Sequence, residues 1–154
     1  MNMLDLAFSY LRQAKPRMEN AERARADSNH PYAFRLAQEC TELCIKASLR
    51  AVGIEYPKQH EVSDMLVEVK ERFPPWFLEE IPFVQRTSKS LFRKRELAFY
   101  GGEDRLLSPD EAIGEEDSKA AVEAGSRVYA LCEKLVSELR VGPTGGSPGS
   151  QSPA

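Results

Sequence analysis

The stretch that decides the fold is HPYAFRLAQECTELCIKASLRAVG, residues 30–53. Its apolar and small residues recur at steps of three and four, which is the period of an amphipathic α-helix. Pro31 suits the first turn of a helix, and Gly53 suits the left-handed position that ends one. Because small side chains dominate the stripe, the pattern predicts a helix that its neighbours approach closely. The stripe consists of Ala33, Leu36, Ala37, Cys40, Leu43, Cys44, Ala47 and Ala51.

The same period continues outward on both sides of this stretch. It predicts helices over about residues 2–26, 60–72, 82–100 and 116–140. Pro16 should kink or divide the first of these, and Pro82 should open the one that ends before Gly101. No segment shows the alternation of apolar and polar residues that is typical of a β-strand. The expected fold class is therefore all-α, an up-and-down helical bundle of four long helices plus a short one.

The distribution of charged residues, glycine and proline separates a domain from a tail and marks an acidic segment within the domain. We expect one domain over residues 1–140 and a flexible tail over residues 141–154, which is rich in Gly, Pro and Ser and carries no charge. Between Gly101 and Asp117 lie seven acidic residues beside one Arg105. That composition predicts a long solvated loop.

Composition excludes several classes of protein. The 154 residues carry 21 Lys+Arg and 24 Asp+Glu, a net charge of −3, which argues against nucleic-acid binding through overall charge but leaves room for a local basic patch. No apolar stretch is long enough to span a membrane, and the N-terminal residues lack the pattern of a signal peptide. We therefore expect a cytoplasmic protein with neither membrane association nor DNA sequence readout.

Cys40 and Cys44 lie four residues apart on one helix face, as a pair of soft-metal ligands would. No third ligand lies at zinc spacing, and Cys132 is distant in the sequence. Buried cysteine packs as a small hydrophobic residue. We expect core packing, with no metal and no cofactor.

A basic cluster stands out in this acidic chain. Arg86, Lys89 and Arg93 share one helix face, and Lys94 and Arg95 follow directly. Such a cluster suits phosphate, which arginine can bind with two parallel hydrogen bonds. Alternatively, the cations offset the helix dipole and face the acidic segment that follows. The sequence leaves both interpretations open.

Three further polar residues are candidates for a binding site. Glu42 and Lys46 form an i, i+4 pair, which on an ordinary surface stabilises a helix by only about 0.3–0.5 kcal/mol but gains interest if it lines a cleft. His60 stands at the start of the helix predicted over residues 60–72. It is either an acid–base group or an imidazole that ties the preceding loop to the helix.

These stretches resemble those of a known family. Residues 37–47 are similar to the A-Q-x-x-x-E-x-x-x-K-A signature of HEPN domains, and residues 53–62 to that family's G-x-x-x-P-x-x-H-x-hydrophobic stretch. Residues 93–101 resemble the end of its fourth helix, and residues 115–117 the start of its last one. The resemblance covers about residues 3–140.

The resemblance implies a homodimeric bundle of four or five helices. Many HEPN domains are metal-independent ribonucleases, often encoded beside a minimal nucleotidyltransferase as a toxin–antitoxin pair. Their catalytic pattern is an arginine, four to six residues, then a histidine, contributed by both protomers across a cleft. Arg95 matches that arginine, but Tyr100 stands where the histidine is expected. The two histidines of the chain are His30 and His60.

The missing histidine decides the predicted activity. Cleaving RNA without a metal needs a base, an acid and a cation beside the phosphate. Arg95 can supply the cation, but a phenol ordinarily titrates near pH ~10 and is a poor base. We therefore predict a dimeric module that binds RNA, a nucleotide or a partner nucleotidyltransferase without efficient catalysis. The alternatives are a metal-independent ribonuclease toxin using Arg95 and Tyr100, with His60 or Glu42 recruited, and an adaptor that binds a basic partner through its acidic segment.

Overall fold

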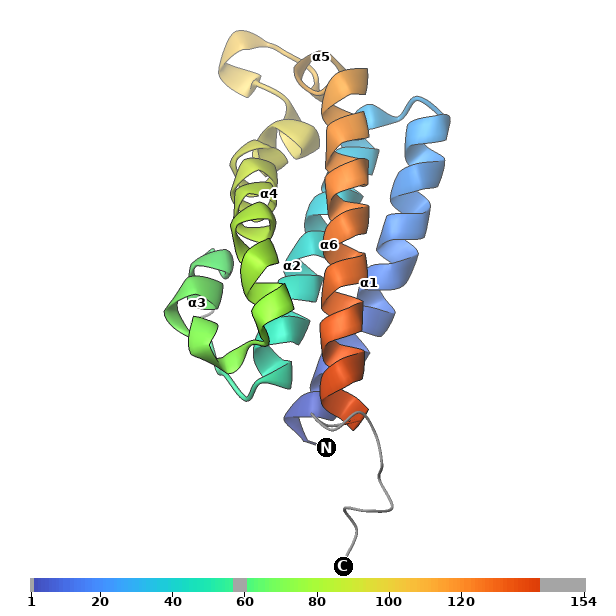
Figure 1. The fold of residues 1–154 in the computed structure, drawn as a ribbon. Coiled ribbons are helices and arrows are strands. Elements are labelled where there is room, and N and C mark those ends of the chain that lie inside the picture. Colours follow the sequence, from blue (N-terminus) through green and yellow to red (C-terminus); the bar gives the residue numbers. More distant parts are fainter. Residues whose placement is uncertain (1, 57–60, 142–154) are drawn as a thin grey trace, which may run out of the picture.

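Four long helices stand side by side in the computed structural model, which describes residues 2–56 and 61–141 (Figure 1). These helices are α1 (Met3–Ala26), α2 (His30–Ala51), α4 (Pro75–Tyr100) and α6 (Glu115–Val141). The shorter elements are α3 (Ser63–Glu68), α5 (Pro109–Ala112) and two 3₁₀ turns, η1 (Lys70–Arg72) and η2 (Glu103–Arg105). The expected all-α bundle of four long helices is confirmed, with more short elements than the single one expected.

Helix α2 is the central element of the bundle. It packs against α1, α6 and α4, and its small residues Ala37, Cys40 and Cys44 are fully buried. The predicted close approach is realised at Gly125 of α6, where an added Cβ would lie 3.5 Å from the Cβ of Ala37 on α2 and 2.8 Å from the Cε of Met18 on α1. The stripe of small residues therefore sets how tightly α1, α2 and α6 pack.

The helix start expected at Pro82 is corrected, and the helix that contains Pro16 is not divided there. Helix α1 runs through Pro16 undivided, and α4 begins at Pro75 and continues through Pro82 instead of starting there. Both prolines lie on the solvent side of their helices, where carbonyl groups can bond to water. Phe77 and Val84 are fully buried on either side of Pro82, so core packing keeps α4 continuous.

The helix expected over residues 60–72 is shorter than predicted. Its α-helical part, α3, is followed by the 3₁₀ turn η1, and His60 lies outside the described residues. The Glu61 carboxylate accepts hydrogen bonds from the backbone N–H and the hydroxyl of Ser63 and from the hydroxyl of Ser88 on α4. These bonds start α3 at Ser63 and hold it against α4.

The segment between Gly101 and Asp117 is more ordered than the solvated loop expected. Gly101 ends α4 with φ +72, and Gly102 pairs with Leu107 in an isolated β-bridge. Helix α5 begins with a capping box, and Ile113 is fully buried. A buried side chain therefore holds this acidic segment against the bundle.

The last helix extends one residue beyond the domain boundary expected at residue 140. It ends at Val141, and the remaining residues of the predicted tail, 142–154, lie outside the described part of the chain. Among the described helices, none is both long and apolar enough to span a bilayer.

Candidate functional site

A pocket of about 520 Å³ opens on the surface of α2, between α1 and α4. Its lining is mostly charged and aromatic, which is unusual for a gap between helices of one bundle. Three of the sequence candidates, Glu42, Arg95 and Tyr100, line it together. The other lining residues are Arg17, Arg35, Gln38, Glu39, Leu43, Glu96 and Phe99.

The floor of the pocket is a polar stripe on α2. Glu39 accepts a hydrogen bond from Nε of Arg17 at 3.0 Å, and its other oxygen lies 3.7 Å from a guanidinium nitrogen of Arg35. Glu42 pairs with Lys46 at 3.2 Å, which places Lys46 beside the pocket although it is not part of the lining. These ion pairs neutralise two of the carboxylates of the floor.

The wall on α4 consists of Arg95, Glu96, Phe99 and Tyr100, and Phe92 lies one turn before it. Phe92, Arg95 and Phe99 follow one another at i, i+3 and i+7, and the Arg95 guanidinium lies 4.2 Å from the ring centroid of Phe92. Arg35 reaches across from α2, with its guanidinium carbon 3.7 Å from the ring centroid of Phe99. Phe99 and Tyr100 remain 49% and 59% exposed, so their rings are open to a ligand.

The Tyr56 ring lies beside two cations near the C-terminal end of α2, beyond Lys46. The Tyr56 ring centroid lies 5.7 Å from the Lys46 ammonium nitrogen and 4.6 Å from the guanidinium carbon of Arg50. Burial raises the pKa of Tyr56 to about 12, although the nearby Arg50 opposes that shift. The phenol therefore stays protonated and neutral at physiological pH.

The basic cluster of the sequence does not form a single surface. Lys89 turns toward α3 and pairs with Asp64 at 2.8 Å and with Glu61 at 3.8 Å. Lys94 pairs with Asp117 at 3.0 Å, so one cation of α4 does meet the acidic segment. Arg93 is exposed and is not among the residues that line the pocket on α2.

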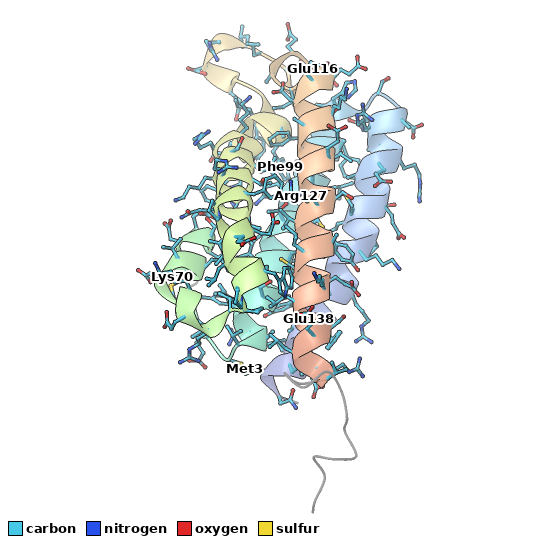
Figure 2. The ribbon with its side chains drawn as sticks, viewed as in Figure 1. Met3, Lys70, Phe99, Glu116, Arg127 and Glu138 are labelled. Carbon is cyan, nitrogen blue, oxygen red and sulfur yellow. The ribbon has the colours of Figure 1, made fainter. Side chains whose placement is uncertain are left out.

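Arg86 lines a second hollow, of about 640 Å³, between α4 and α6. Its inner surface is largely apolar and includes Phe83, Leu91 and Ala121. Arg127 of α6, labelled in Figure 2, bridges to α4 through a 2.7 Å contact with Glu80. This hollow lacks the exposed aromatic pair of the first pocket.

His30 does not line the pocket on α2. Nδ1 of His30 lies 2.7 Å from the hydroxyl of Ser118, which itself donates to the carbonyl of Glu115. This hydrogen bond joins the start of α2 to the start of α6, outside the pocket. The other histidine, His60, is not described. No histidine is therefore among the described residues that line the pocket.

The cysteines pack in the core. Cys40, Cys44 and Cys132 are fully buried, and the Sγ atoms of the first two lie 3.9 Å apart. Burial raises the pKa of the Cys44 thiol well above its usual range, so it stays protonated. Within residues 2–56 and 61–141, no three His, Cys, Asp or Glu side chains are placed to hold a metal ion.

Comparison with known proteins places the chain in a family. The family model for the HEPN domain matches residues 8–135, so the chain belongs to the HEPN domain family. The fold is shared with the crystal structure of an archaeal HEPN homologue, with a TM-score of 0.62 and 22% sequence identity over 84% of this chain and 97% of that one. No curated protein matches the chain.

Proposed function

We propose that this protein is a homodimeric HEPN module that binds RNA or nucleotides in the pocket between α1, α2 and α4, without efficient catalysis. The observation that carries the proposal is the placement of Arg35 over Phe99, with Arg95 in the same pocket. Unpaired bases stack on aromatic rings and on guanidinium planes. The exposed rings of Phe99 and Tyr100 offer such a surface.

The charge of the pocket suits a phosphate beside a stacked base. Arg17 and Arg35 are engaged by Glu39, whereas Arg95 has no ion-pair partner among the described residues. Its guanidinium lies on Phe92, which leaves its N–H groups available to a phosphate. Arg95 is therefore the residue we assign to the ligand's phosphate.

The lining side chains argue against efficient cleavage. A phosphodiester cleaved without a metal needs a group that removes the proton of the 2′-hydroxyl at neutral pH. No described residue of the pocket is a histidine, and Glu39 and Glu42 are held in ion pairs. The third glutamate, Glu96, is exposed, and a carboxylate is a much weaker base than an imidazole. The proposal is therefore a binding protein.

Exposed apolar side chains near the pocket support self-association. Phe92 on α4 is 37% exposed, and Leu106, in the segment that follows α4, is 91% exposed with a left-handed φ of 55. A large apolar side chain held in such an open position is typical of an interaction surface. A dimer formed through this surface would bring two pockets to one cleft.

Binding of a fluorescent single-stranded RNA, followed by anisotropy, tests the proposal. We expect Arg95→Ala to weaken binding about tenfold or more, because it removes a charge-assisted contact to phosphate. Lys119→Ala on α6 removes the same charge from an exposed residue outside the pocket and should change the affinity little. Equal affinity of the wild type and Arg95→Ala would overturn the proposal.

A second candidate is a weak metal-independent ribonuclease, the toxin of a pair with a minimal nucleotidyltransferase. It is favoured by the shared placement of Arg95 and Tyr100 in the pocket. It predicts RNA cleavage that persists in chelator and disappears in Arg95→Ala and Tyr100→Phe. Cleavage by both variants at the wild-type rate would identify a contaminant. Copurification with a co-expressed nucleotidyltransferase tests the pairing.

A further inference from the structure

One carboxylate of the pocket differs from the other two. Both oxygens of Glu39 face arginines, and both oxygens of Glu42 accept hydrogen bonds, from Gln38 and Lys46. Glu96, by contrast, is exposed and has no hydrogen-bond or ion-pair partner among the described residues, although it lines the same pocket. Glu96 therefore has two free acceptor oxygens to offer a ligand.

The helix places Glu96 beside the stacking surface. It precedes Phe99 by three residues, and residues three apart are neighbours on a helix surface. Arg95 comes directly before it and also lines the pocket. A base stacked on Phe99 and Tyr100 would therefore present its edge to the Glu96 carboxylate, while its phosphate reaches Arg95.

A free carboxylate selects among bases by the donors on their edges. An ionised carboxylate only accepts hydrogen bonds, and its two oxygens lie side by side. Guanine carries two adjacent donors, N1–H and the 2-amino group, on its Watson–Crick edge. Adenine places a donor beside an acceptor there, and the acceptor N1 would repel a carboxylate oxygen. Hypoxanthine keeps N1–H but lacks the 2-amino group.

We infer that the pocket prefers guanine, with the Glu96 carboxylate accepting hydrogen bonds from N1–H and the 2-amino group. This inference rests on the proposed function, because it assumes that the pocket binds a nucleotide. In this arrangement Glu96 selects the base, and Arg95 binds the phosphate, which all nucleotides share.

The test is calorimetric titration of the full chain with GMP, IMP and AMP. We expect GMP to bind about tenfold more tightly than IMP, because a hydrogen bond to a charged group is lost with the 2-amino group. AMP should bind at least as weakly as IMP. In Glu96→Gln the affinities for GMP and IMP should come within about twofold of each other, since an amide offers one acceptor and one donor.

The control variant is Glu79→Gln, which changes an exposed glutamate of α4 outside the pocket and should keep the preference for GMP. Equal affinities of the wild type for the three nucleotides would overturn the guanine inference and leave the proposed function standing. Retention of the preference in Glu96→Gln, with an unchanged circular dichroism spectrum, would remove Glu96 from its role. Failure to bind any nucleotide or RNA would overturn the proposed function as well.

Discussion

Phe99 is the residue on which the binding site depends most directly. Its ring is half exposed, is covered on one side by the Arg35 guanidinium at 3.7 Å, and lies 4.7 Å from the Tyr100 ring. It is not part of the hydrophobic core of the described residues, which on α4 includes Leu91 and the neighbouring Ala98. Phe99 therefore contributes to the surface of the pocket more than to the stability of the fold.

Phe99→Ala separates binding from stability. We expect the free energy of unfolding in urea to fall by no more than about 1 kcal/mol, as for exposed positions. RNA affinity should fall at least fivefold, because a stacked base is worth about 1–3 kcal/mol on an aromatic side chain. Phe77→Ala, at a fully buried position of the same helix, is the opposite control and should cost about 3–5 kcal/mol of stability. A Phe99→Ala protein with wild-type affinity would contradict the stacking role.

Gly101 sets where α4 ends and hence where Tyr100 lies. Its φ is +72, and an added Cβ would lie 2.0 Å from the carbonyl oxygen of Leu107. Gly101→Ala should therefore lower stability by more than about 1 kcal/mol, seen as a lower thermal midpoint. Gly114→Ala is the matched control, because no heavy atom lies within 4 Å of its added Cβ. Equal midpoints for the two variants would show that the turn rearranges freely.

At the scale of elements, α4 supplies four of the ten residues that line the pocket, and the start predicted for it is wrong. The periodic pattern of its apolar residues predicts the helix, but the sequence places its start at Pro82, whereas the helix begins at Pro75. Proline rules describe an isolated helix, whereas here Phe77 and Val84 are buried against other elements on both sides of the proline. The start of α4 therefore depends on tertiary packing, which the periodicity of the sequence does not reveal.

The contact between α3 and α4 should depend on pH. The hydrogen bond from Lys89 lowers the pKa of Asp64 below its ordinary value of 3.8, with a smaller contribution from Gln85. Because the folded pKa is the lower one, the stabilisation is present above pH 3.8 and is lost as the pH falls through the folded value. Both side chains are exposed, so the effect is small.

Lys89→Met is the variant that measures this effect. Its stability should be lower than that of the wild type at pH 7, and the difference should shrink below pH about 4, where Asp64 becomes protonated. Chemical unfolding at several pH values follows the difference. A difference that stays constant from pH 7 to pH 3 would show that the pair contributes nothing through charge.

At the scale of the whole molecule, the fold was predictable, whereas only three of the ten residues that line the pocket were. The stripe on α2 identified the central helix, and the family signature located Glu42, Arg95 and Tyr100. Arg17 and Arg35 join them only because α1 packs along α2 and Phe99 faces Arg35. In the sequence, the missed residues could be recognised only by their i, i+4 spacing, as in Arg35 and Glu39 and in Arg95 and Phe99. Spacing along one helix does not tell which neighbour a side chain faces.

The predicted dimer is a property of the whole molecule and has its own test. Light scattering during gel filtration should give twice the mass of one chain for the wild type. Phe92→Asp should shift the protein toward the monomer, because it places a charge in the exposed apolar surface. Val67→Asp changes a side chain of similar exposure, 43%, on α3 and should leave the dimer intact. A wild-type monomer would contradict self-association.

The central claim is that RNA or a nucleotide occupies the pocket between α1, α2 and α4. Titration of the ¹⁵N-labelled protein with GMP, followed by amide chemical shifts, tests it most directly. We predict that the largest shifts fall on residues 35–43 of α2 and 95–100 of α4, which line the pocket. Shifts concentrated between α4 and α6, around Arg86 and Ala124, or no shifts at all, would contradict it.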